Sequence, residues 1–239
     1  MSRKIILGEI YYSKLAPALE KLGYEPLCLP KNPFVDKRLA SHTDLSLFSN
    51  GAGTFVAAPY LRKKDIIRRL ESSGITVRFA EIAQSSEYPN DAALNALLFS
   101  DKLIYAEKIT ANEVIEASRG AAGDDLRLIS VKQGYVRCSV CALGNNALIT
   151  ADGGIAKSLE REGLDVLLIS RQGVLLDGFE YGFIGGASVL LEDDLLAFTG
   201  TTSAIADAKE IERFAAAHGV RTVFLTDGPA FDIGGAIVI

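Results

Sequence analysis

The stretch GGAIVI at residues 234–239 repeats a pattern that the chain has already used four times. Each copy has a polar or small start and continues as an apolar strand. The earlier copies are HTDLSLF at 42–48, ALNALLF at 93–99, RCSVCAL at 137–143 and GGASVLL at 185–191. The copies therefore start near residues 42, 93, 137, 185 and 234, at intervals of 44 to 51 residues. A period of this size indicates a repeat architecture in which each copy belongs to one supersecondary unit.

The sequence around these copies predicts the rest of the unit. A short polar turn leads into a second apolar strand, and a stretch with helical periodicity follows, as at 61–70 and 204–214. Glycine stands where most of these helices should end in a left-handed cap, at Gly23, Gly74, Gly163 and Gly219. Another apolar strand comes next. The repeating unit is therefore strand–strand–helix–strand.

The two termini together supply the fifth unit. Its last copy stops after one strand, whereas residues 1–30 predict a strand at 4–7, a helix at about 15–22 and a strand at 24–29. Pairing the last strand with the first would close a ring and remove its exposed sheet edges. We therefore predict one α/β domain over residues 1–239, a five-fold pseudo-symmetric α/β propeller. The alternative is an unrelated α/β sheet whose segments look alike by chance.

Five such units, with Gly-Gly pairs and a His-x-Asp sequence at strand starts, resemble the pentein fold, a five-bladed α/β propeller. The resemblance covers the whole chain. That superfamily contains enzymes that modify guanidino groups: arginine deiminases, amidinotransferases and dimethylarginine hydrolases. It also contains a non-enzymatic relative, the ribosome anti-association initiation factor. The resemblance thus implies the fold and leaves catalysis and binding as alternatives.

Composition argues against several classes of protein. The net charge of -5 has the wrong sign for broad nucleic-acid contact, and no apolar run reaches the roughly 20 residues of a membrane span. The first apolar segment is too short for a signal-peptide core, and three cysteines do not make a disulfide scaffold. We expect a cytoplasmic protein without nucleic-acid or membrane partners and without a cofactor. We also expect no metal, because Cys28 and two distant histidines form no recognised ligand set. The oligomeric state is left open.

Alternation along the strands separates two faces of each copy. Even positions are the more apolar in the first three copies, so the odd positions are expected to line the central axis. The polar residues that this brings together at one end of the channel are His42, Asp44, Asn95, Arg137 and Ser139, with Cys141 beside them. They would form either a closed polar plug or a site for a small polar ligand. Cys138 and Cys141 would face opposite sides of a strand, which argues against a redox pair.

The resemblance to guanidino-modifying enzymes is incomplete at the positions that matter for catalysis. Those enzymes carry a nucleophilic cysteine in the last blade and an acidic residue on each side of a Gly-Gly pair. Here residues 231–239 contain no cysteine, and both Gly-Gly pairs lack both acids. The His-x-Asp motif is matched by His42 and Asp44, but in the first copy and not in a late one. We therefore expect no arginine deiminase, amidinotransferase or dimethylarginine hydrolase activity by the usual route.

Three functions fit these observations. The first is binding of a small polar ligand at the channel mouth through His42, Asp44, Asn95, Arg137 and Ser139. The second is a cysteine-dependent hydrolase or transferase acting on a guanidino-type substrate, with a relocated site of Cys141, His42 and Asp44. The third is a non-enzymatic, partner-binding protein like the initiation factor.

Overall fold

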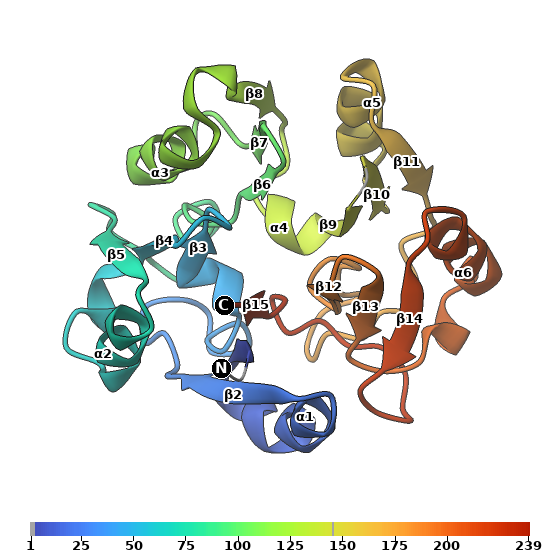
Figure 1. Ribbon diagram of the computed structural model, residues 1–239, viewed down its shortest axis with the longest axis horizontal. Coiled ribbons are helices and arrows are strands. Elements are labelled where there is room, and N and C mark those ends of the chain that lie inside the picture. The colour runs from blue at the N-terminus through green and yellow to red at the C-terminus, as the bar shows by residue number, and fades with distance from the viewer. Residues whose placement is uncertain (1–2, 145) are drawn as a thin grey trace.

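Five three-stranded sheets surround a common centre in the computed structural model, which describes residues 3–144 and 146–239 (Figure 1). The first complete blade shows the arrangement. Its inner strand β3 (Leu47–Ser49) is antiparallel to β4 (Thr54–Ala57), and helix α2 (Asp65–Ser72) leads to β5 (Thr76–Phe79), which is parallel to β4. The predicted strand–strand–helix–strand unit is confirmed.

The next three blades repeat this order. The second blade consists of β6 (Leu97–Phe99), β7 (Lys102–Tyr105), α3 (Asn112–Ala122) and β8 (Arg127–Ser130). The third consists of β9 (Val140–Gly144), β10 (Ala147–Thr150), α5 (Gly153–Arg161) and β11 (Asp165–Leu168). The fourth consists of β12 (Ser188–Glu192), β13 (Leu195–Phe198), α6 (Ala208–Ala217) and β14 (Arg221–Phe224). Short helical turns occupy Thr43–Leu45 (η1), Pro59–Leu61 (η2), Gly123–Asp125 (η3), Val136–Ser139 (α4) and Thr202–Ala204 (η4).

The fifth blade joins the two ends of the chain. Strand β1 (Arg3–Gly8) is parallel to β2 (Tyr24–Leu29), which follows helix α1 (Glu9–Lys21), and β1 is antiparallel to β15 (Ile237–Val238). Ile5 pairs with Val238 and Ile6 with Ile237. The C-terminal strand β15, paired with β1, accordingly lies near the centre of the ring (Figure 1). The predicted closure by the terminal strands is confirmed.

The helices form where the sequence has apolar residues at helical spacing. Helix α2 buries Ile66, Ile67 and Leu70, and after its end Gly74 adopts a φ of +83°, a conformation that costs glycine little. The other three glycines predicted to end helices also have positive φ. Among the described residues, no helix is both long and apolar enough to cross a membrane.

Apolar cores fill the five interfaces between neighbouring blades. Phe198 of β13 packs in one cluster with Ile149 of β10, and Ile5 of β1 packs in another with Ala197 of β13. Three further clusters join the other pairs of neighbours in the same way, and a small additional one contains Val35, Leu39, Ala40 and Leu45. Each blade is therefore stabilised from both sides, and the ring holds the segments at its centre in fixed positions.

The start of each repeat differs from the prediction. The first positions of the copies are not strand: Thr43–Leu45 form η1 and Val136–Ser139 form α4, and the inner strands begin only afterwards. Side chains in a helical turn advance by about 100° per residue and do not alternate. The expected separation of odd and even positions is therefore wrong at the positions that were predicted to line the axis.

Candidate functional site

The segments that precede the inner strands bring Cys138, His42, Asp44 and Asp232 together. Cys138 lies on α4, His42 immediately precedes η1, Asp44 lies within η1, and Asp232 lies five residues before β15. Their exposed fractions are 2%, 2%, 3% and 2%, so all four are buried. Burying such groups costs free energy unless hydrogen bonds or opposite charges compensate it, and buried titratable groups of this kind cluster at functional sites.

The thiol and one carboxyl are in direct contact. Cys138 Sγ donates a hydrogen bond to Asp44 Oδ2 at 2.6 Å, and it accepts a longer one, of 3.4 Å, from Asn95 Nδ2. The Asn95 side-chain oxygen accepts from the backbone N–H groups of Arg137 and Cys138, at 2.7 and 3.3 Å. Asn95 therefore fixes the start of α4 and the position of the thiol that α4 carries.

The imidazole faces the second carboxyl. His42 Nδ1 lies 3.9 Å from Asp232 Oδ1, and His42 Nε2 is buried without a hydrogen-bond partner among the described residues. Asp232 accepts from the backbone N–H groups of Phe183 and Gly234, both at 2.9 Å. Two backbone donors thus hold the carboxylate beside the histidine.

Two glycines allow this close packing. A Cβ at Gly186 would collide with the Asp232 carboxylate, and one at Gly234 would lie 2.5 Å from His42 Cβ and 2.7 Å from Asp44 Oδ1. The two Gly-Gly pairs therefore permit close approach of neighbouring segments at the axis, as the sequence indicated.

Burial sets the charge state of this cluster. It raises the pKa of Asp44 to about 7, an effect that the Cys138 hydrogen bond opposes and that the nearby Asp232 strengthens. Burial and the two carboxyls together hold the pKa of the Cys138 thiol well above its usual value. Burial also lowers the pKa of His42, against the attraction of Asp232. At neutral pH the protein alone therefore keeps both the thiol and the imidazole uncharged.

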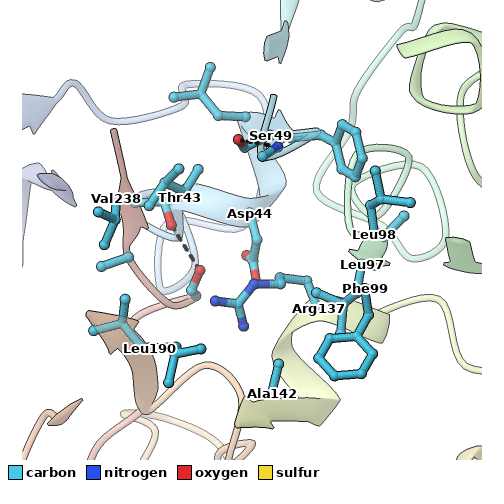
Figure 2. A pocket seen from close by; sticks show the side chains of 18 of the residues that line it. Thr43, Asp44, Ser49, Leu97, Leu98, Phe99, Arg137, Ala142, Leu190 and Val238 are labelled. Atoms are coloured by element: carbon cyan, nitrogen blue, oxygen red, sulfur yellow. Dashed lines mark hydrogen bonds between the residues drawn. The ribbon is translucent and has the colours of Figure 1, made fainter. Parts of the chain in front are cut away.

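Among the described residues, Cys138 and Asp44 line two different cavities, and Asp232 also lines a third, more open one together with Lys14 and Arg38. The thiol pocket, of about 270 Å³, is lined by His42, Cys138 and Asp232 together with aromatic side chains; these are Tyr135, Phe179, Tyr181 and Phe183. The axial cavity, of about 340 Å³, runs along the five inner strands and is lined by Asp44 and Arg137 among others. Figure 2 shows Asp44 and Arg137 entering the axial cavity from different elements. Asp44 belongs to the axial cavity and Cys138 to the thiol pocket, so their contact separates the two.

The predicted site residues are therefore divided. Asp44 and Arg137 line the axial cavity, and Arg137 Nη1 donates to Gly185 O at 3.3 Å. His42 lines the thiol pocket instead, and Asn95 is fully buried behind the thiol. Ser139 is buried, and its hydroxyl has no partner in the described parts of the chain. His42, Asp44, Asn95 and Arg137 therefore do meet around Cys138, but they divide between two cavities, and their role in binding a ligand stays a prediction.

Cys141 does not join the cluster. It is 0% exposed in the apolar core that β9 and β10 share with the next blade, and burial raises its pKa to about 11. Cys141 was expected in the site because the pattern at 137–141 predicts a strand. Since residues 136–139 are helical, Cys138 is the cysteine that reaches His42.

A second repeated position was missed. The residues two places before the repeat starts at 93, 137, 185 and 234 are Asp91, Tyr135, Phe183 and Asp232. Tyr135, Phe183 and Asp232 line the thiol pocket, and the fourth residue, Asp91, accepts a hydrogen bond from Tyr135. The alignment of the copies could have shown this column, had it been extended upstream.

The cluster also has the donors of a possible metal site. One atom each of His42, Cys138 and Asp232 lie within 4.8 Å of one another. Nitrogen, sulfur and carboxylate donors suit a zinc ion with an open fourth position. The sequence predicts no metal, and His42, Cys138 and Asp232 are the residues on which to test that prediction.

Residues 6–237 match the family of unknown function DUF6873. The chain belongs to this family. No curated protein matches its sequence.

Solved structures resemble this DUF6873 member over its whole length. A mutant of DDAH from Pseudomonas aeruginosa, complexed with citrulline, has a TM-score of 0.60 and 12% identity, with 100% of both chains covered. The inosamine-phosphate amidinotransferase StrB1 from Streptomyces griseus has a TM-score of 0.56 and 14% identity, covering 98% and 91%. The amidinotransferase SxtG from Microseira wollei has a TM-score of 0.56 and 10% identity, with 99% of this chain and 93% of that chain covered. The DUF6873 chain therefore has the pentein fold, as predicted.

Proposed function

We propose that this protein is a cysteine-dependent hydrolase or transferase that acts on a small cation of guanidino or amidino type, with Cys138 as the nucleophile. The observation that carries the proposal is the buried group of Cys138, His42 and Asp232 at the thiol pocket. The proposed site keeps His42 and Asp44 of the relocated site that the sequence predicted. Cys138 takes the place of Cys141. The similar folds of enzymes named for guanidino or amidino chemistry support the substrate class.

The lining of the thiol pocket favours a cation. Among the described residues, no lysine or arginine lines it, whereas Glu180 and Asp232 do. The aromatic side chains of its wall offer π faces to a positive charge. A cation bound here would also oppose the effect of the two carboxyls on the thiol, and so favour the thiolate that attacks.

The residues divide the reaction as follows. Cys138 Sγ attacks the central carbon of the substrate, and the thiol proton leaves its hydrogen bond with Asp44 Oδ2 and passes to His42, which lines the same pocket. The C–N bond breaks, and the departing nitrogen takes that proton from His42. Water or an acceptor amine then breaks the new C–S bond and restores the thiol. Asp232 stabilises the imidazolium that forms between these steps.

Matched alkylating reagents test the proposal. 2-Chloroacetamidine is a cation, and 2-chloroacetamide is its neutral counterpart. The exposed Cys28 provides an internal reference in the same chain. Mass spectrometry should show that the ratio of amidine to amide labelling is higher at Cys138 than at Cys28. Equal ratios at the two cysteines would overturn the proposal.

Turnover and metal content complete the test. Release of ammonia, amine or urea from a panel of guanidino compounds should be lost in Cys138→Ala and kept in Cys141→Ala. Bound zinc that protects Cys138 from both reagents until a chelator removes it would contradict a free nucleophile and assign the cluster to a metal centre.

A further inference from the structure

We infer that Tyr135 selects the substrate of this site by accepting a hydrogen bond from a substrate N–H, because Asp91 holds the tyrosine proton. The inference rests on the proposed function and assigns a residue that determines which cations enter. Nothing in the repeated Gly-Gly or His-x-Asp sequences points to Tyr135 or to Asp91.

Tyr135 and Asp91 form a hydrogen-bonded pair beside the thiol pocket. Tyr135 lines the thiol pocket, immediately before the helical turn that carries Cys138. Its hydroxyl donates to Asp91 Oδ2 at 2.7 Å. Asp91 is 1% exposed, and its second carboxylate oxygen has no partner among the described residues.

A tyrosine hydroxyl has one proton and two lone pairs. When the proton is directed at Asp91, the oxygen can offer only lone pairs to the pocket. Burial and the Asp91 carboxylate both raise the pKa of Tyr135, so the hydroxyl retains its proton. The Tyr135 oxygen could accept a hydrogen bond from an N–H of a guanidinium or amidinium. A carbonyl oxygen in the same place would find no donor, because the tyrosine oxygen is itself an acceptor there.

The ring is held in this orientation from several sides. It packs against Tyr88 with 5.2 Å between centroids and against Phe183 with 6.3 Å. Gly134 makes room for Tyr88, because a Cβ there would lie 2.8 Å from its ring. The ring therefore has a fixed place in the wall of the thiol pocket, and Asp91 fixes the direction of its hydroxyl, as selection between donors and acceptors requires.

Three variants separate the hydroxyl from the ring. Tyr135→Phe removes the acceptor. Asp91→Asn keeps the shape but can donate to the tyrosine oxygen, which turns the hydroxyl proton toward the pocket. Tyr88→Phe is the matched control, because it removes a neighbouring hydroxyl outside the pair.

The readout is the ratio of labelling rates at Cys138 by 2-chloroacetamidine and 2-chloroacetamide. The ratio should fall by about ten-fold or more in Tyr135→Phe and at least as far in Asp91→Asn, and should stay at the wild-type value in Tyr88→Phe. A ratio unchanged in both pair variants, or lowered equally in the control, would overturn the inference.

A second measurement keeps this test independent of thiol chemistry. In the Cys138→Ala background, calorimetry compares the binding of acetamidine and acetamide, with thermal unfolding to confirm that each variant folds. If amidine preference is present and is lost in Tyr135→Phe, the tyrosine selects the cation even where the thiol proves unreactive. If amidine preference is absent, the inference fails, whatever the labelling of Cys138 shows.

Discussion

Cys138 Sγ and Asp44 Oδ2 lie 2.6 Å apart although 94 residues separate them in the sequence. The thiol lines one cavity and the carboxyl lines the other. A change in the protonation of Asp44 therefore acts directly on the thiol. A ligand in the axial cavity and a substrate in the thiol pocket would both reach this one hydrogen bond.

The raised pKa of Asp44 predicts a specific pH dependence of stability. The folded state binds this proton more tightly than the unfolded state, so the group stabilises the fold most at low pH. That contribution is lost as the pH rises from about 4 to about 7, the folded-state value. Relative to Asp44→Asn, the wild type should lose roughly 1.4 kcal/mol per pH unit within that window. Urea unfolding at a series of pH values measures the free energy of unfolding. If its dependence on pH were the same in the wild type and in Asp44→Asn, the prediction would be refuted.

Truncation of Asp44 distinguishes a plug from an open site. If Asp44 neutralised Arg137 within a closed plug, Asp44→Ala would leave a buried cation and cost roughly 3–5 kcal/mol. Arg137 is only half-buried and lines the axial cavity, so we expect a cost of about 1 kcal/mol, equivalent to about 2–4 °C in Tm. His42 and Asp44 should then matter more for ligand binding than for stability. A much larger fall in Tm would support the plug.

Gly186 should not tolerate a side chain. A Cβ there meets the Asp232 carboxylate, so Gly186→Ala should displace Asp232 from His42 and lower turnover as well as stability. Gly228→Ala is the matched control, because a Cβ there meets no atom of the described residues within 4 Å. Thermal unfolding and thiol labelling of both variants check this. If Gly186→Ala and Gly228→Ala had the same Tm and the same rate of thiol labelling, the contact at Gly186 would be unimportant.

Cys141 should contribute to packing alone. Its full burial in an apolar core predicts that Cys141→Ala lowers stability by about 1 kcal/mol while turnover is kept. Cys141 should also become accessible to alkylation only when the protein unfolds, which labelling in increasing urea measures. Rapid labelling of Cys141 in the folded protein would contradict this placement.

The fold could be predicted from the sequence because it follows from repetition. The starts near 42, 93, 137, 185 and 234 and the split fifth unit determine the number of blades and the pairing of β1 with β15. Glycines such as Gly74 locate helix ends through the same local chemistry in every unit. Local pattern and global arrangement agree at these positions.

The site was predicted only in part, because side-chain direction depends on the backbone at each position. A short apolar run with polar residues at its start fits a strand or a helical turn equally well, and at 136–139 it is a turn. His42 and Asp44 were found through their motif, whereas Asp232 belongs to no motif. Asn95 was selected for its polarity, but its work of holding α4 and the thiol depends on contacts across blades.

Closure of the ring also sets the order in which the protein can become functional during synthesis. His42 and Cys138 leave the ribosome long before Asp232, and β15, which follows Asp232, covers the open edge of β1. A nascent chain that has formed its first blades therefore contains Cys138 and His42 but lacks Asp232, the carboxylate that faces His42. Residues 232–239 complete both the ring and the buried group around Cys138, so a chain that lacks these residues has neither.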